Sequence, residues 1–381
     1  MDFPIIYRRF WSINMKPYYL FISLIVLFLC SANIIALTGE SKAVSEVVKN
    51  YNARGDFEGV VLVAKGGRVI HKQAVGLANR EWKIPHRLDT RFRICSITKQ
   101  FTAVLVMQLV EAGKLNLDTP VSEYLPDFRK NSGGKITLRN LLSSSSGLPT
   151  FDDLAFWQKD DEQLASASFT AMNYISSSSS SGLSFEPGAK FNYNNADFIL
   201  VGAILEQISG KSFEQLLQEK ILQPLGMKRT GILKQKEITE NLASGYIKQN
   251  SQIFKEPYFH IQNYSSAGAM YSTAEDMLLW NTALLTNKLL SEKYRNEMFA
   301  PIENLGFVAL GSWSYPLELP NGRKITVVER QGYIGGFCAL NIIVPGSDLS
   351  LVFLSNTETQ TLFMTYAKQG LSYEVIKTLD L

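Results

Sequence analysis

The stretch RICSITKQF, residues 93 to 101, places Ser96 three residues ahead of Lys99, at the start of a run that is almost wholly apolar. Positions i and i+3 share one face of a helix, so this hydroxyl and this amine can come within hydrogen-bonding reach. A neutral amine beside a hydroxyl is a general base beside a nucleophile. An ordinary S-x-x-K is far more often a helix cap followed by a solvated lysine. The pair is therefore a candidate catalytic centre that needs support from other residues.

The residues around this pair favour catalysis over a cap. Residues 96–112 are apolar on nearly every face, which is typical of a helix buried inside a domain. Lys99 then falls in a first turn where the helix dipole favours acids, and burial also disfavours its ammonium form. Both effects lower the pKa of Lys99. Cys95 is a rival nucleophile without a recognisable histidine partner, and we interpret it as a packing residue.

A serine-lysine centre also needs a proton relay and an oxyanion hole. The segment FEPGAKFNYNNADF, residues 185–198, contains Tyr193 and Asn195 in a Y-x-N spacing, after a Pro-Gly turn and before a predicted helix. The phenol could relay protons, and the amide could hold a substrate carbonyl or amide. The alternative is a core tyrosine followed by Asn195 as a helix cap.

Other catalytic and binding motifs are missing from the sequence. No G-x-S-x-G elbow occurs, and SGKS at residues 209–212 lacks the first glycine of a phosphate loop. His71, His86 and His260 show no metal-ligand spacing and no setting for a Ser-His-Asp triad. We therefore expect neither a metal nor an organic cofactor.

The elements that would position these residues suggest an α+β fold. Residues 59–76 form two β-rich runs around Gly-Gly, and residues 324–356 indicate three more strands with a PGSD turn. We expect the two chain ends to form one antiparallel sheet flanked by helices, with a mostly helical region inserted between them. Ser212 and Gln215 resemble a capping box. Helices are predicted over residues 96–112, 138–142, 197–208, 212–222, 273–285 and 361–378.

Composition narrows the classes of partner. The chain has 381 residues, 46% of them hydrophobic, which is ample for a core. It has 38 basic and 35 acidic residues without a long run of one sign, so we expect no nucleic-acid surface and favour a small-molecule or peptide substrate. Cys95 and Cys338 are too few for a disulfide framework. The serine tracts at 143–146 and 176–181 are expected to be flexible loops.

Residues 1–37 have the layout of a targeting segment. Arg8, Arg9 and Lys16 precede the apolar stretch YYLFISLIVLFLC, and small residues follow. This is either a cleaved signal peptide or a membrane anchor, because residues 18–37 are just long enough to cross a bilayer. In both cases we expect residues 38–381 to work outside the cytoplasm, as a secreted or periplasmic protein or one anchored by residues 18–37.

With SITK upstream of YNN, the chain resembles the penicillin-recognising serine hydrolases: class C β-lactamases, D-alanyl-D-alanine carboxypeptidases and family VIII-type esterases. The resemblance covers residues 45–360 and includes KITLRNLLSSSSGLP, QPLGMKRTG and SAGAMYSTAEDMLLW. It implies a β-lactamase/transpeptidase-like fold, with an α/β part at about 38–120 and 265–381 and a helical part at about 121–264.

The resemblance also implies roles for four of the residues. Ser96 would be the acylated nucleophile and Lys99 its activating partner. Tyr193 would shuttle protons in acylation and deacylation, while Asn195 would contact the substrate amide.

The third motif of these relatives, Lys or His, any residue, then Gly, falls on Arg330, Gln331 and Gly332. Gly332 would let the substrate approach the strand, and the backbone N–H groups of Ser96 and Tyr333 would form the oxyanion hole. Arg330 departs from the family pattern. Arginine can anchor a carboxylate through its planar fork, but it cannot give up a proton.

The implied activity is hydrolysis of an amide or ester through a Ser96 acyl-enzyme. A D-amino peptide derived from peptidoglycan, a β-lactam and a simple ester all remain open as substrates. The alternative is a weakly active or inactive penicillin-binding-like protein that binds the cell wall or a partner, because Arg330 and Tyr333 slow turnover.

Overall fold

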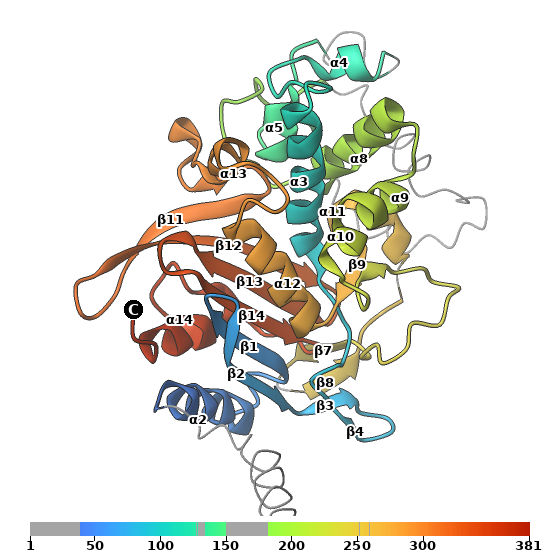
Figure 1. Cartoon of the computed structure of the whole chain (residues 1–381). Coiled ribbons are helices and arrows are strands. Elements are labelled where there is room, and N and C mark those ends of the chain that lie inside the picture. The colour runs from blue at the N-terminus through green and yellow to red at the C-terminus, as the bar shows by residue number, and fades with distance from the viewer. Residues whose placement is uncertain (1–38, 127, 129–133, 150–181, 251, 259) are drawn as a thin grey trace, which may run out of the picture. The chain divides into compact units, whose positions relative to one another are not determined.

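A seven-stranded antiparallel sheet joins the two ends of the folded chain (Figure 1). The computed structural model describes residues 39–126, 128, 134–149, 182–250, 252–258 and 260–381. From one edge of the sheet to the other, the strands are β10 (Val308–Ala309), β11 (Ser312–Glu318), β12 (Lys324–Ile334), β13 (Phe337–Val344), β14 (Leu349–Ser355), β1 (Gly59–Lys65) and β2 (Arg68–Val75).

The predicted hairpin and the predicted group of three strands are both confirmed. Gly66 and Gly67 close the β1–β2 hairpin with φ angles of 56° and 73°, in the left-handed region that favours glycine. Strand β14 pairs with both β13 and β1, which joins the C-terminal strands to the N-terminal hairpin. Its residues are buried along the whole strand, as expected for the middle of a sheet covered on both faces.

Helices cover both faces of this sheet. Val44 of α2 (Gly39–Ala53) and Val375 of α14 (Gly370–Lys377) share a core with Val61 and Phe353 on one face. On the other face, α12 (Ala274–Leu285) packs on β14 and β1. Side chains alternate between the two faces of a strand, so each central strand contributes side chains to both hydrophobic cores.

The remaining elements are short, apart from two long helices that pack against each other. The long helices are α3 (Thr98–Glu111) and α8 (Asn195–Ser209). The shorter helices are α4 (Val121–Tyr124), α5 (Leu138–Leu142), α9 (Phe213–Leu217), α10 (Gln223–Leu225), α11 (Ser265–Gly268) and α13 (Glu292–Phe299). Small sheets pair β3 (Leu77–Asn79) with β4 (Ile84–Pro85), β7 (Tyr246–Gln249) with β8 (Gln252–Lys255), and β9 (Met270–Ser272) with both β5 (Phe92–Arg93) and β6 (Gly231–Ile232).

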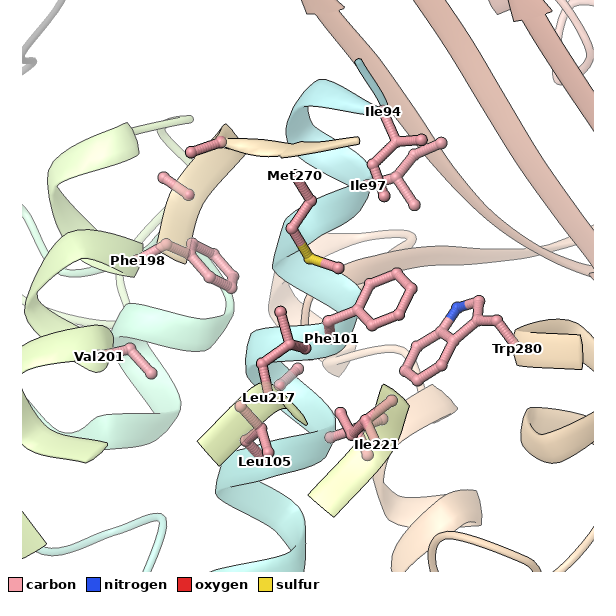
Figure 2. Close-up of a cluster of buried hydrophobic side chains, with 14 of the residues drawn as sticks. Ile94, Ile97, Phe101, Leu105, Phe198, Val201, Leu217, Ile221, Met270 and Trp280 are labelled. Carbon is pink, nitrogen blue, oxygen red and sulfur yellow. The ribbon is translucent and has the colours of Figure 1, made fainter. Parts of the chain in front are cut away.

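Helix α3 is enclosed by apolar side chains from several elements, as Figure 2 shows. Phe101 stacks on Trp280 of α12 with ring centroids 3.8 Å apart. Phe198 of α8 and Met270 of β9 approach the same helix near its N-terminus (Figure 2). All four side chains are buried. Residues 98–107 of this helix are all buried, so packing on all sides fixes the position of its first turn.

Most predicted helices are confirmed, and one is wrong. The helix at 138–142 and the capping box of Ser212 and Gln215 are present as expected. The predicted helix over 361–378 is instead a 3-10 turn (Gln360–Phe363) followed by α14 from Gly370. Gly370 has a φ of 76° and packs against the Thr361 carbonyl, which a continuous helix would not allow.

The prediction that Ser143–Ser146 form a flexible loop is also wrong. All four residues are buried. Ser143 Oγ donates to the Arg139 carbonyl at 2.8 Å, and Ser146 Oγ donates to Asp197 at 2.6 Å. Hydroxyls that bond nearby backbone and side-chain groups can stabilise a compact turn, which composition alone does not reveal.

Two predictions fall outside the described residues: the targeting segment at 1–37 and the serine tract at 176–181. Within the described part of the chain, every helix is too short or too polar to cross a membrane.

Candidate active site

Ser96 lies in a tight turn that leads from β5 into α3. The 3-10 turn (Cys95–Ile97) precedes α3, and Cys95 adopts a left-handed φ of 51°. Such backbone conformations cost about 1–3 kcal/mol and cluster at active sites. Thr98 Oγ1 donates to the Cys95 carbonyl at 2.7 Å, and Met270 accepts from Ile94 N at 3.0 Å. The turn is therefore fixed from both sides and presents Ser96 to the pocket.

Cys95 is a packing residue, as predicted. Its side chain is fully buried, and burial is the main reason that the pKa of its thiol is raised. Cys95 and Cys338 are both free thiols. A buried thiol that stays protonated is a poor nucleophile, so Ser96 is the better candidate nucleophile in this turn.

Lys99 is fully buried, so the reading of a solvated lysine is wrong. Its Nζ donates to Asn195 Oδ1 and to the Ala267 carbonyl at 2.7 Å each, and to Ser96 Oγ at 3.1 Å. Three acceptors match the three N–H groups of an ammonium. The amine is thus held in place beside Ser96 by α8 and α11.

Tyr193 lies closer to the Ser96 hydroxyl than Lys99 does. Its hydroxyl lies 2.6 Å from Ser96 Oγ. Lys99 Nζ and the Arg330 guanidinium lie 5.0 Å and 5.3 Å from the centre of its ring. Burial acts to raise the pKa of Tyr193, but the charges of Lys99 and Arg330 outweigh it, so the pKa lies below its ordinary value. The phenol is therefore suited to take up the serine proton.

Asn195 is not the cap of α8. The cap is Asn194, whose side chain accepts a hydrogen bond from Ala196 N at 3.0 Å. Asn195 begins the helix and turns its oxygen to Lys99. The sequence left open whether Asn195 caps the helix or belongs to the site. In the structure Asn194 is the cap, and Asn195 belongs to the site.

Arg330 lies under the site, with 4% of its surface exposed. Its Nε donates to the Ser96 carbonyl at 3.0 Å, and its Nη2 donates to Tyr193 Oη at 3.2 Å. The guanidinium also lies over the Trp313 ring, 4.2 Å from the centroid. Arg330 thus joins strand β12 to the nucleophile turn and to the tyrosine.

Gly332 brings strand β12 directly against the nucleophile turn. A Cβ atom at this position would lie 2.3 Å from the Ile94 carbonyl oxygen and 3.2 Å from the Cβ of Cys95. The turn and the strand pack backbone to backbone here, which is a reason for glycine besides substrate access. The oxyanion hole expected from the N–H groups of Ser96 and Tyr333 stays a prediction.

Ser96, Tyr193, Arg330 and Tyr333 line one pocket of about 660 Å³. The other residues lining it are Phe191, Trp313, Gln331, Cys338, Glu358, Gln360, Phe363 and Met364. Most of these side chains are aromatic or apolar, as is usual for pockets that bind small organic ligands. The pocket thus places a buried nucleophile at the edge of a largely apolar cavity.

Asp197 forms an unexpected buried acid two residues beyond Asn195. Ser146 Oγ donates to its Oδ1 at 2.6 Å, while its Oδ2 has no hydrogen-bond partner among the described residues. Burial raises the pKa of this carboxyl well above its ordinary value, against the opposing effects of Ser146 and Lys99. The folded state therefore favours the neutral acid.

The Asp197→Asn variant should be more stable than the parent protein at pH 8 but nearly equal to it at about pH 3.5, below the ordinary pKa of an aspartate. The folded pKa is raised, so the stabilising protonated form is lost as pH rises, and unfolding releases a carboxyl that prefers to ionise. The advantage of the variant should grow by up to about 1.4 kcal/mol per pH unit between the two pKa values. Urea unfolding at both pH values measures it, and an advantage independent of pH would contradict this account.

Comparison with known proteins identifies the family. The Beta-lactamase family profile matches residues 44–370. The chain belongs to the β-lactamase family. It is therefore a member of a family of serine hydrolases, and the β-lactamase/transpeptidase-like fold that the resemblance implied is confirmed.

Individual members of the family are distant. Protein flp of Staphylococcus aureus (strain MW2) is 28% identical over 341 residues, which cover 85% of this chain and 65% of flp. The penicillin binding protein from Bacillus halodurans has a TM-score of 0.71 and 28% identity, over 87% of this chain and 97% of its own. The D-amino acid amidase of Ochrobactrum anthropi SV3 has a TM-score of 0.75 and covers 89% of this chain and 98% of its own. Its identity is 23%, so it supports the fold alone.

The structure brings all seven residues predicted for the site together and adds four more. Ala267 contributes through its carbonyl, which no side-chain motif can reveal. Trp313 and Glu358 line the pocket from elements far from any predicted motif. Asp197 lies in the same segment as Tyr193. The only sequence signal that could have revealed it was an acidic residue among the apolar residues of the predicted helix.

Proposed function

We propose that this chain is a hydrolase that acts outside the cytoplasm and cleaves an amide or ester through an acyl-enzyme on Ser96. The observation that carries the proposal is the contact of Ser96 Oγ with Tyr193 Oη at 2.6 Å and with Lys99 Nζ at 3.1 Å, at the edge of a pocket. The nucleophile, proton acceptor and cation needed for acyl transfer thus meet at one atom.

In the first half of the reaction, Ser96 Oγ attacks the substrate carbonyl and its proton passes to Tyr193. Lys99 donates to three acceptors, so the serine proton faces the phenol instead of the amine. The oxyanion is bound by the backbone N–H groups of Ser96 and Tyr333. Collapse breaks the bond to the leaving group, which takes the proton from Tyr193. Water then attacks the ester by the same route in reverse, and Ser96 is restored.

Arg330 would act mainly on Tyr193 in this scheme. The phenolate is the basic form, so kcat/KM rises with pH through the pKa of Tyr193. Arg330→Gln removes one of the two charges that lower this pKa, and the rising limb should move up by about one pH unit, with about a tenfold loss of kcat/KM at pH 7. Arg330→Lys keeps the charge and should leave the limb nearly in place. The pH profile of an uncharged ester measures this, and identical limbs in both variants would remove Arg330 from the scheme.

The substrate class is supported by similarity to relatives. The similarity to the penicillin binding protein from Bacillus halodurans favours an amide, and a peptidoglycan-derived D-amino peptide is the first candidate. Work outside the cytoplasm is supported by the basic and then apolar layout of residues 1–37.

Covalent labelling tests the proposal. A fluorophosphonate and a fluorescent penicillin are each applied to the parent protein and to Ser96→Ala. We expect labelling of the parent and none of the variant. Penicillin labelling favours a cell-wall substrate, and fluorophosphonate labelling alone favours an esterase. A parent protein that takes neither label would overturn the acyl-enzyme and favour a binding protein instead.

A further inference from the structure

We propose that Glu358 makes the pocket beside Ser96 selective for ligands that combine an apolar body with a cationic amine. The inference rests on the proposed function, since it names the class of substrate for that site. Its basis is the position of one carboxylate in the wall of a largely aromatic and apolar pocket.

Glu358 reaches the pocket from the segment that follows strand β14. Strand β14 ends at Ser355, which pairs with Cys338, and Cys338 pairs with Tyr333 on the next strand. The segment after β14 therefore lies at the same end of the sheet as Tyr333. Burial first, then the negative charge of Glu358, raises the pKa of Tyr333 to about 12. The tyrosine thus stays neutral and brings no positive charge to Glu358.

The carboxylate has no cationic partner within the described part of the chain. The carboxylate accepts a hydrogen bond from the backbone N–H of Lys248, at 3.4 Å. The Lys248 ammonium itself bonds the Gly55 carbonyl at 3.1 Å. Among the described residues, no Lys, Arg or His forms an ion pair with Glu358. Glu358 is only partly buried, so it can reach a ligand in the pocket, and a ligand ammonium would supply the countercharge that the described residues do not.

The rest of the pocket suits the same ligand. Phe191, Trp313 and Phe363 provide aromatic walls, and Met364 adds an adaptable apolar side chain. Aromatic faces attract ammonium groups and also bury an apolar body. The cation of the pocket, Arg330, is almost fully buried and turned toward Ser96 and Tyr193. A ligand carboxylate would instead meet the negative charge of Glu358.

This inference opposes the sequence-based expectation that Arg330 anchors an acidic group of the substrate. The two readings predict opposite orders of affinity for ligands of the same size. A cation that binds best supports Glu358 as the selecting residue, whereas an anion that binds best supports Arg330.

Competitive inhibition decides whether Glu358 or Arg330 selects the ligand. Inhibitors are not cleaved, so the test does not require knowing which part of a substrate occupies the pocket. The assay follows Ser96-dependent hydrolysis of a neutral ester, p-nitrophenyl acetate. The inhibitors are 3-phenylpropylamine, 3-phenylpropanol and 3-phenylpropanoate. We expect the amine to bind about tenfold more tightly than the alcohol and the carboxylate to bind most weakly, because a hydrogen bond to a charged group is worth about that factor.

Glu358→Gln should bring the amine and the alcohol to nearly equal inhibition constants, because the amide keeps the shape but not the charge. The matched control is Glu237→Gln, an exposed glutamate paired with Lys234, and it should keep the parent order. Equal inhibition by amine and carboxylate, or an order that survives Glu358→Gln, would overturn the inference. If the parent protein shows no Ser96-dependent hydrolysis of the ester, it is the proposed function that fails.

Discussion

Replacing Tyr193 with phenylalanine should lower kcat/KM for a neutral ester about a thousandfold, within the range expected for loss of a positioned acid or base. The change removes one oxygen, which lies 2.6 Å from Ser96 Oγ and receives Arg330 Nη2 at 3.2 Å. The ring stays between Lys99 and Arg330, so the pocket keeps its shape. KM should change little, because the phenol acts on the proton during the chemical step and not on the binding of substrate. Steady-state kinetics with p-nitrophenyl acetate measure both parameters.

Tyr124→Phe is the matched control. It also removes a phenolic oxygen that is hydrogen-bonded, here to the backbone of Asn116. Tyr124 lies in α4, outside the pocket that Ser96 lines. The control should retain nearly full activity. A loss of less than about tenfold in Tyr193→Phe would mean that another group takes the serine proton, and Lys99 would be the next candidate.

Gly332→Ala is expected to have the second large effect, a loss of about a hundredfold to a thousandfold in kcat. The added Cβ would lie 2.3 Å from the Ile94 carbonyl oxygen, so the strand and the nucleophile turn must separate. Separation moves the N–H of Tyr333 away from that of Ser96, and an oxyanion hole works only when both donors face one oxygen. Overpacking should also lower the free energy of unfolding by about 1–3 kcal/mol.

The loss of kcat and the loss of stability in Gly332→Ala can be separated with a control variant and a measurement on the folded protein. Gly346→Ala adds the same methyl group in the turn between β13 and β14, where nothing lies within 4 Å of the new Cβ. It should leave both kcat and the free energy of unfolding nearly unchanged. For Gly332→Ala, kcat is measured at a temperature where circular dichroism shows the folded protein. Full kcat in the folded variant would show that this contact does not set the oxyanion hole.

The sequence predicted the main strands and the buried helix where residues close together in the chain formed a clear pattern. The Gly66-Gly67 turn, the runs of the three C-terminal strands and the apolar helix after Ser96 each depend on residues close together in the chain. The catalytic candidates were found in the same way, because S-x-x-K and Y-x-N are local spacings. Their proximity, between residues 97 positions apart, came from the family resemblance and not from physics.

The parts that could not be predicted depend on contacts between distant segments. The choice of Asn194 over Asn195 as cap was decided by Lys99, which attracts the second amide. The tract Ser143–Ser146 is buried because Asp197 and local carbonyls accept its hydroxyls. The helix expected over 361–378 is interrupted because Gly370 must pack on Thr361. Glu358 had no motif at all, since only the pairing of β12, β13 and β14 brings it beside Tyr333.

The central claim is that Ser96 carries the acyl group during turnover, and the mass of the protein during hydrolysis tests it most directly. The protein is mixed with a slowly deacylating ester, quenched in acid within the first turnovers, digested and analysed by mass spectrometry. The account predicts an added acyl mass on the peptide that contains Ser96, and no such adduct in Ser96→Ala, which should also lose turnover. Unmodified Ser96 during rapid turnover, or turnover of Ser96→Ala at the parent rate, would contradict it.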